Sequence, residues 1–283
     1  MPELPEIETI KIFFKNLLIG QKIKEIEILS KKQFPQNKDE ILGRKVIDVC
    51  RFAKILILKL DNKKALVIHL KLSGQLVWTD KKSTEITLGH PVPKAGTILP
   101  SKTTRVIITF EKGKLFFNDL RKFGWIKIMT EKEVCLVIKK LGVEPLSKEF
   151  SLQKLVMILQ NSRRAVKVLL IDQAKISGIG NIYANEALFE AKTNPKRPAK
   201  ELSKKEAELL RGAIIKVLEK GIKYGGSSGK DELYIRPDGT KGKFQNYFKV
   251  YQRQGEPCKN CAGKVKRINL GGRGTFFCPN CQK

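Results

Sequence analysis

The chain begins Met1-Pro2-Glu3-Leu4-Pro5-Glu6, a stretch that combines a helix start with reactive groups. Removal of the initiator methionine would expose Pro2 as a free secondary amine, with Glu3 directly beside it. Such an amine can form a Schiff base with an aldehyde carbon while a neighbouring carboxyl group transfers protons. Pro2 and Glu3 are therefore candidate catalytic residues, and Glu6 lies close behind them.

The same stretch also fits an ordinary helix start. Pro5 suits the first helical turn, where its missing N–H costs nothing, and Gly20 offers a stop. Apolar residues recur between them at helical spacing: Ile7, Ile10, Phe13, Phe14, Leu17 and Leu18. The helix dipole favours carboxylates near the N-terminus, which would explain Glu3, Glu6 and Glu8 without any chemistry. Both interpretations stay open at this point.

The chain is strongly basic. Its 283 residues include 56 Lys and Arg against 28 Asp and Glu, giving a formal charge of +28. This excess predicts a polyanionic partner, most simply nucleic acid, although a ribosomal protein or a Lys-rich lineage would look similar. No apolar run approaches the ~18 residues of a membrane helix, and no basic-then-apolar leader opens the chain. We therefore expect a cytoplasmic protein with no membrane contact.

The first half of the chain has the pattern of a β-sandwich that follows one helix. Its strand-like segments are Lys22–Leu29, Lys45–Leu60, Ala65–Leu72, Arg105–Glu111, Lys114–Asn118 and Trp125–Met129. The polar, Pro-containing segment Thr79–Lys102 predicts a long loop. Cys50 and Cys135 stand alone inside apolar patterns and are expected to be reduced core thiols.

The second half is predicted to be helical up to about residue 224. Helices are expected at Glu131–Leu141, Ser151–Gln160, Ala165–Gln173, Asn181–Glu190 and Ser203–Lys223. Ser203 and Glu206 have the spacing of a capping box, and Gly225–Gly229 predicts a flexible segment. We expect three domains, at 1–141, 142–225 and 226–283, the last with a compact ribbon at about 246–283.

Four cysteines near the end form two tight pairs, Cys258-x-x-Cys261 and Cys278-x-x-Cys281, separated by sixteen residues (262 to 277). This spacing predicts a four-thiolate zinc ribbon, and the absence of a leader argues against disulfides. Four ligands leave no open position, so we expect one structural Zn²⁺. Arg273 lies between glycines in the intervening hairpin, where it suits a phosphate contact or a solvated basic tip.

A glycine-bounded turn, Ser177-Gly178-Ile179-Gly180-Asn181, precedes a predicted helix in the middle of the chain. Glycines before a helix start allow close backbone approach to an anion. Asn181 is expected to cap the helix, to bind a phosphate, or to do both. The basic residues near this turn favour a phosphate: Arg163, Arg164, Lys167 and Lys175.

Taken together, these stretches resemble formamidopyrimidine-DNA glycosylase over nearly the whole chain. The resemblance rests on Met1–Glu6, on Gly178-Ile179-Gly180-Asn181-Ile182-Tyr183-Ala184, and on the ending Cys278-Pro279-Asn280-Cys281-Gln282-Lys283. The related endonuclease-eight branch usually has Gly where this chain has Leu4, which favours the formamidopyrimidine branch. The resemblance implies an α+β multidomain fold: an N-terminal β-sandwich with an N-terminal helix, a helix-two-turn-helix domain and a four-Cys zinc finger.

The resemblance also implies a base-excision-repair enzyme. It would remove 8-oxoguanine and formamidopyrimidines from double-stranded DNA and then cleave the abasic site by β- and δ-elimination. The DNA would lie between the lobes of a monomer in the bacterial cytoplasm, associated with the nucleoid. By resemblance, Pro2 is the nucleophile at the sugar C1′, Glu3 assists ring opening and Glu6 is a supporting carboxylate. Lys54 is implied in β-elimination, and Arg273 in δ-elimination and phosphate binding.

The remaining implied residues contact DNA. Arg121 matches the residue that contacts the base opposite the lesion, and Phe123 matches a wedge, although core packing would also explain a Phe. Leu72 replaces the usual Met at the third void-filling position, and Thr103 replaces a phosphate-contacting His. His69 and His90 have no visible partner in the sequence and are expected to be structural or loop residues. Phosphate contacts near the lesion are implied for Lys167 and Asn181, with Arg163 beside them.

Two alternatives remain open from the sequence. The first is an endonuclease-eight-like enzyme for oxidised pyrimidines, with the same chemistry and a different pocket. The segment Gly225–Gly242 is expected to cover the flipped base, but the sequence does not fix its shape. The second is a noncatalytic DNA-binding protein with a zinc ribbon, which would not need an exposed Pro2.

Overall fold

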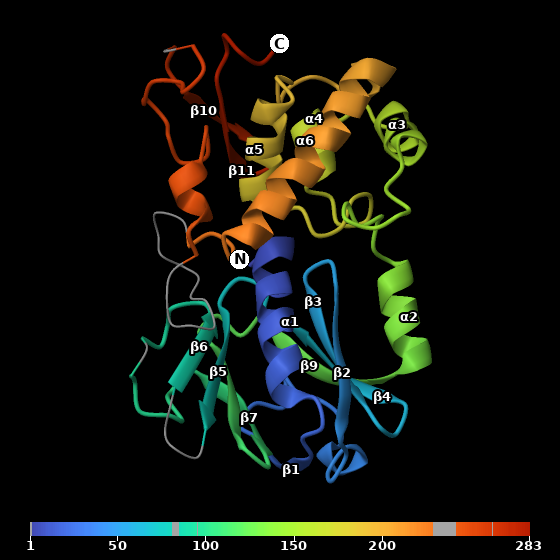
Figure 1. The fold of residues 1–283 in the computed structure, drawn as a ribbon, viewed down its shortest axis with the longest axis vertical. Helices are drawn as coiled ribbons and strands as arrows, with labels where there is room; N and C mark the ends of the chain where they lie inside the picture. The colour runs from blue at the N-terminus through green and yellow to red at the C-terminus, as the bar shows by residue number, and fades with distance from the viewer. Residues whose placement is uncertain (1, 81–84, 95, 229–241, 262) are drawn as a thin grey trace. The chain divides into compact units, whose positions relative to one another are not determined.

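The structure is a computed structural model that describes residues 2–80, 85–94, 96–228, 242–261 and 263–283. The chain packs into two compact units, and each is formed by two separate stretches. The first unit comprises 1–139 and 224–243, and the second comprises 140–223 and 244–283 (Figure 1). The predicted α+β class is confirmed, while the predicted boundaries at 141/142 and 225/226 stay predictions.

The first unit is a β-sandwich preceded by the helix α1 (Leu4–Leu18). A four-stranded antiparallel sheet has the order β2-β3-β4-β9, and a five-stranded one has the order β1-β7-β8-β5-β6. The strands are β1 (Ile23–Ile28), β2 (Val46–Phe52), β3 (Ile55–Leu60), β4 (Lys64–His69), β5 (Gly74–Asp80), β6 (Glu85–Gly89), β7 (Thr104–Phe110), β8 (Gly113–Asp119) and β9 (Trp125–Thr130). A 3₁₀ turn, η1 (Lys38–Glu40), lies between β1 and β2, and α2 (Glu131–Lys139) follows β9.

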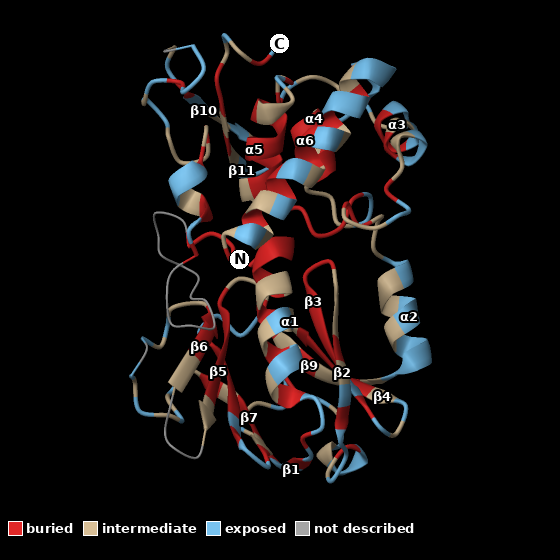
Figure 2. Ribbon diagram, viewed as in Figure 1, coloured by how far each residue is buried: buried red, intermediate tan, exposed pale blue. Residues whose placement is uncertain are grey.

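One apolar core holds this unit together. It joins the inner faces of both sheets to α1, through side chains such as Phe14, Leu66, Trp78 and Phe117. Figure 2 shows long buried stretches along α1 and the strands. Alternate strand residues face the same side of a sheet, so Val106, Ile108, Leu115 and Phe117 point into this core, whereas Ile107 and Phe116 on the opposite face form a separate cluster with Val77. The burial of these side chains is the main force that assembles the sandwich.

Two loops at one end of the sandwich carry the chain between the sheets. The first links β4 to β5 through residues 70–73, and the second links β8 to β9 through residues 120–124. Because β4 pairs with β9 and β5 pairs with β8, the two loops lie side by side. The register places His69 opposite Trp125 and Gly74 opposite Asp119 at the bases of the loops.

Several local predictions were wrong. The segment Lys45–Leu60 is a hairpin of β2 and β3, which turns at Ala53 with a φ of 50°. The predicted loop Thr79–Lys102 contains the end of β5 and the whole of β6, which pair with each other. These strands were missed because their apolar runs are short and flanked by glycine and polar residues. Cys135 is exposed on α2, so it is not a core thiol.

The second unit contains four α-helices among its described residues: α3 (Leu152–Gln160), α4 (Val166–Leu170), α5 (Asn181–Glu190) and α6 (Lys204–Lys223). It also contains the 3₁₀ turns η2 (Ala199–Glu201) and η3 (Phe244–Tyr247) and the hairpin of β10 (Lys266–Leu270) and β11 (Arg273–Phe277). The helix predicted at 165–173 is shorter, since α4 ends at Leu170. The capping box of α6 is confirmed, because the Ser203 N–H donates to Glu206 and the Glu206 N–H donates back to Ser203 Oγ. None of the described helices combines the length and apolar composition that crossing a membrane requires.

Candidate active site

The start of α1 places three candidate residues together in a buried position. Pro2, Glu3 and Glu6 are all buried. Glu3 is the N-cap residue, and its N–H donates to Glu6 Oε2 at 2.7 Å. The other carboxylate oxygen, Oε1, accepts the N–H of Ser227 at 2.8 Å. Glu6 therefore holds the backbone beside Pro2 to a segment of chain that returns from much later in the sequence.

That returning chain was not recognised from the sequence. Ser227 and Ser228 are buried, and Ser228 Oγ accepts the N–H of Gly242 at 2.9 Å. The Lys243 N–H donates to the Tyr224 carbonyl at 3.0 Å, so the two ends of the segment are tied together. The predicted flexible segment Gly225–Gly229 thus includes residues with firm partners. The prediction that Gly225–Gly242 covers a flipped base falls mainly on residues outside the described ones.

Lys54 lies at the turn between β2 and β3 and is buried. Two residues before this turn, Arg51 donates from Nε to Glu8 Oε2 at 2.7 Å and from Nη1 to the Ala53 carbonyl at 3.1 Å. Burial opposes the ionisation of Glu8, but hydrogen bonds from Lys11 and Arg51 outweigh it and lower the pKa of this carboxyl. Glu8 thus joins the helix of Pro2 to the hairpin of Lys54.

The candidate void-filling residues lie on the two loops between the sheets. Phe123 is 52% exposed, which rules out core packing, and the Arg121 guanidinium lies 5.2 Å from the centre of its ring. Leu72 is partly buried on the neighbouring loop. Thr103 is partly buried too; its carbonyl accepts the Asp119 N–H at 2.9 Å, so it supports the second loop.

Both histidines accept backbone N–H groups close to them in the chain, as structural or loop residues do. His69 Nδ1 accepts the N–H of Lys71 at 3.0 Å, and His90 Nδ1 accepts that of Val92 at 3.2 Å. Burial, together with the nearby charges of Lys71 and Lys54, lowers the pKa of His69 to about 3. His69 is therefore neutral near pH 7 and shapes the loop that bears Leu72.

In the second unit, Asn181 does not cap α5, because Gly180 is the N-cap residue. Its Nδ2 donates instead to the carbonyl of Gly274 at 3.0 Å, and its Oδ1 is buried without a hydrogen-bond partner among the described residues. One turn later, Asn185 Oδ1 accepts the N–H of Phe276 at 2.7 Å. Two amides on α5 thus hold the hairpin that carries Arg273, whose side chain is exposed.

The other basic candidates differ in exposure. Arg163 is exposed, and its neighbour Arg164 forms an ion pair with Asp172 at 2.7 Å. Lys167 is fully buried on α4. A phosphate could reach Arg163 directly, whereas a contact with Lys167 would need its surroundings to open.

Glu186 is a buried residue that the sequence did not single out. Its carboxylate accepts the N–H groups of Lys249, Val250 and Tyr251 at 2.8 to 3.0 Å. Burial raises the pKa of Glu186, although these three bonds oppose the shift. The only sign of this role in the sequence was an acidic residue on a mostly apolar predicted helix. Glu186 anchors the backbone of residues 249–251, which leads into the cysteine module.

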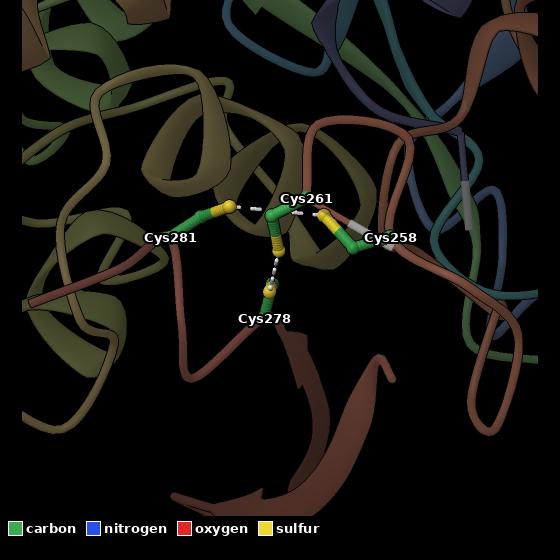
Figure 3. A group of neighbouring side chains, drawn as sticks. All are labelled: Cys258, Cys261, Cys278 and Cys281. Carbon is green, nitrogen blue, oxygen red and sulfur yellow. Dashed lines mark hydrogen bonds between the residues drawn. The ribbon is translucent and has the colours of Figure 1, made fainter. Parts of the chain in front are cut away.

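The four cysteines Cys258, Cys261, Cys278 and Cys281 form one cluster (Figure 3). Their sulfur atoms lie within 4.8 Å of one another, with Cys258–Cys281 at 3.8 Å and Cys261–Cys278 at 3.5 Å. A disulfide needs about 2.05 Å between sulfurs. Four thiolates at about 2.3 Å from a tetrahedral Zn²⁺ would lie about 3.8 Å apart. The cluster therefore fits one structural zinc ion and not two disulfides, as the spacing predicted.

The chain matches three family models. The formamidopyrimidine-DNA glycosylase N-terminal domain matches residues 1–126, and the H2TH domain of the same enzymes matches 141–232. The zinc finger found in FPG and IleRS matches 255–283. Formamidopyrimidine-DNA glycosylases from Pelotomaculum thermopropionicum and Thermus thermophilus are each 36% identical to this chain. The alignments cover 100% of this chain and 99% and 98% of those proteins.

Solved structures agree with these matches. The MutM (Fpg) protein of Thermus thermophilus superimposes with a TM-score of 0.86 at 35% identity, covering 99% of this chain and 98% of that one. A Lactococcus lactis Fpg mutant in complex with Fapy-dG-containing DNA gives 0.87 at 31% identity and covers both chains fully. Lactococcus lactis Fpg bound to abasic-site DNA gives 0.86 at 31% identity over 99% of each chain. The chain therefore belongs to the formamidopyrimidine-DNA glycosylase family and is a DNA glycosylase with an H2TH domain and a zinc finger.

Proposed function

We propose that this glycosylase is bifunctional: it removes oxidised purines from double-stranded DNA and cleaves the resulting abasic site. The observation that carries the proposal is the buried group at the start of α1. There Glu3 directly follows Pro2. The Glu6 carboxylate accepts the Glu3 N–H with one oxygen and the Ser227 N–H with the other. Association with the nucleoid would follow from DNA binding and stays a prediction.

The first chemical step needs Pro2 as a free amine. Model α-amines titrate at about 7.7–8.0, and burial disfavours their charged form, so a usable fraction is neutral near pH 7. The Pro2 nitrogen attacks the sugar C1′, and the C1′–N bond breaks as its electron pair leaves with the base, which takes up a proton. Glu3 supplies a proton to the ring oxygen, so the sugar opens and a covalent iminium forms.

Strand cleavage follows from the same iminium. Loss of a C2′ proton breaks the C3′–O3′ bond and releases the 3′ phosphate group (β-elimination). A second proton loss breaks the C5′–O5′ bond (δ-elimination), and water then hydrolyses the imine to free Pro2. Lys54 and Arg273 would bind the two phosphates, where positive charge favours the departing anions.

The base must leave the stack before Pro2 can reach its sugar. Exposed Phe123 and partly buried Leu72 supply apolar surface that can enter the gap, and Arg121 can donate to the base left behind. Arg163, Lys167, Asn181 and Thr103 would contact phosphates, which sets register rather than sequence preference.

The solved relatives support both steps and keep one alternative open. Lactococcus lactis Fpg has been crystallised with Fapy-dG-containing DNA and with abasic-site DNA. The same enzyme has also been crystallised with DNA containing an oxidised pyrimidine. Oxidised pyrimidines are therefore the second candidate substrate. The noncatalytic alternative is set aside by the family membership.

Borohydride reduction tests the proposal. Incubation with an 8-oxoguanine duplex and borohydride should give a covalent protein–DNA adduct, because reduction traps the iminium. The adduct should disappear in Pro2→Gly and in protein that retains Met1. Protein with a free Pro2 that binds the duplex but gives neither adduct nor cleavage would overturn the mechanism.

A parallel reaction with a dihydrouracil duplex separates the two substrate classes. We expect faster single-turnover excision of 8-oxoguanine than of dihydrouracil. The reverse order would assign the protein to oxidised pyrimidines and leave the Pro2 chemistry in place.

A further inference from the structure

Asp119, the last residue of β8, is a fully buried acid that receives hydrogen bonds from both loops between the sheets. Ser73 Oγ, on the first loop, donates to Asp119 Oδ1. The Gly124 N–H, on the second loop, donates to Oδ2 at 2.6 Å. The Arg121 N–H lies 3.0 Å from Ser73 Oγ and 3.2 Å from Asp119 Oδ1. One carboxylate thus joins the loop of Leu72 to the loop of Arg121 and Phe123.

Close packing around this carboxylate leaves little room for movement. A Cβ on Gly124 would lie 2.8 Å from the Phe117 ring and 3.1 Å from Asp119 Oδ2. A Cβ on Gly74 would collide with the backbone of Leu70, which also accepts the Gly74 N–H at 2.9 Å. The bases of both loops are therefore fixed.

The tips of the loops contrast with their bases. Leu120 and Phe123 are each 52% exposed and Arg121 is exposed, whereas Ser73 and Asp119 are buried. Burying an acid is unfavourable unless donors satisfy it, and here the donors come from both loops. The sandwich core does not need a carboxylate at this position, because apolar contacts assemble the sheets.

We infer that Asp119, together with Ser73, is a positioning residue that makes the two loops enter an opened duplex as one unit. Neither residue needs to touch DNA. Asp119 would fix Leu72, Arg121 and Phe123 relative to one another before binding, so that no ordering is required when the base leaves the stack. The inference rests on the proposed function, since it matters only if the enzyme opens a duplex.

The inference predicts different effects on two substrates that both react with Pro2. An 8-oxoguanine in a duplex must be extruded and its gap filled, whereas an abasic site in single-stranded DNA requires neither. Weakening the loop connection should therefore slow excision from the duplex but leave borohydride trapping on the single-stranded abasic site unchanged. A general loss of structure would impair both reactions.

Two variants test this difference. Ser73→Ala removes the hydroxyl that donates to Asp119 Oδ1 and accepts the Arg121 N–H at 3.0 Å. Asp119→Asn also places an NH₂ group or a weaker acceptor against the Ser73 hydroxyl and the Gly124 N–H, so it affects both loops. Thr104→Val is the matched control: it removes a buried hydroxyl that donates to Asn118 at 2.7 Å in the same sheet and accepts the Ser101 N–H at 2.9 Å.

We expect duplex excision under single-turnover conditions to fall about tenfold in Ser73→Ala and up to about a hundredfold in Asp119→Asn. Trapping on the single-stranded abasic site should stay within about twofold of wild type for Ser73→Ala, and Thr104→Val should match wild type on both substrates. Equal losses of Ser73→Ala on both substrates, or no loss on the duplex, would overturn the inference. Failure of the wild type to be trapped at all would instead overturn the proposed function.

Discussion

Two helices of this protein begin with the same capping arrangement and use it differently. At α1 the Glu3 N–H donates to Glu6, and at α6 the Ser203 N–H donates to Glu206. The carboxylate of Glu206 is paired with Arg197 at the surface, and hydrogen bonds from Arg197 and from Ser203 lower its pKa to about 2. Glu6 is only 1% exposed and receives the Ser227 N–H on its second oxygen.

The difference shows that the sequence motif of a capping box does not reveal whether its residues have a role beyond stabilising the helix. At α6 the first residue is a serine, whose hydroxyl only caps the helix. At α1 it is Glu3, whose carboxyl group is the proposed proton donor, and it adjoins Pro2. The box at α6 stabilises a helix, whereas the box at α1 also holds an acid in place. A third helix, α5, has no such box, and its N-cap residue is Gly180.

Removing zinc should have the largest effect on activity. It should disrupt the hairpin that α5 holds and leave the capping box of α1 intact. The hairpin held by Asn181 and Asn185 depends on the cysteine cluster, whereas the partners of Glu6 lie in the first unit. Chelation should unfold the C-terminal module and abolish cleavage of a lesion duplex, and added Zn²⁺ should restore both. Metal content, circular dichroism and cleavage are measured together. Full activity of metal-free protein would contradict a structural zinc.

Glu3→Gln should separate the two capping boxes most clearly. Glutamine keeps an acceptor oxygen but cannot donate the proton for ring opening, so single-turnover excision should fall about 10²–10⁴-fold with little change in melting temperature. The matched variant at α6, Ser203→Asp, should leave excision unchanged. If the loss of excision in Glu3→Gln is matched by an equivalent loss of protein stability, the capping box at α1 only stabilises the helix.

The basic residues before α5 should show a smaller effect. Arg163→Ala should weaken duplex binding and reduce the slope of log K against log salt by about 0.9, the value for one phosphate contact. Lys167→Ala should do the same if a phosphate reaches its buried side chain. Arg164, already paired with Asp172, is the control and should leave the slope unchanged on mutation to Ala. An unaltered slope for Lys167→Ala would remove it from the phosphate contacts.

The smallest expected effect is the pH dependence of the stability that Glu206 of the α6 capping box contributes. Because the pKa of Glu206 is lowered from 4.5 to about 2, its stabilising effect is complete above pH 4.5 and is lost as the pH falls towards 2. The effect is modest because the pair with Arg197 is close to solvent. Glu206→Gln should melt below wild type near neutral pH, and the difference should vanish near pH 2. A difference that persists there would argue against this titration.

The features that could be predicted from the sequence share one property: their residues are close together in the chain. The CxxC pairs, the box of Ser203 and Glu206 and the start Met1–Glu6 are local patterns whose spacing nearly dictates their geometry. The predicted capping of α5 by Asn181 was wrong, because the side chain bonds instead to Gly274, which is 93 residues away; its phosphate contact stays a prediction.

What could not be predicted depends on pairing between distant residues. No local pattern marks Ser227 as the partner of Glu6, or the backbone of Val250 as a donor to Glu186. Nor does a pattern reveal that Ser73 and Asp119, 46 residues apart, share a hydrogen bond. Strand β6 was not predicted for a similar reason. Its five residues lie between polar segments and form a strand only because β5 pairs with them.

The bond between Glu6 and Ser227 spans 221 positions of the chain, and this has a consequence for protein synthesis. The ribosome releases α1 early, but the backbone that completes its surroundings emerges only after most of the second unit has been made. A product truncated before residue 227 would keep the bond from Glu3 to Glu6 but would lack the one from Ser227. The nascent chain therefore completes the surroundings of Glu6 late, after the helices α3 to α6 have been translated and before the zinc finger has.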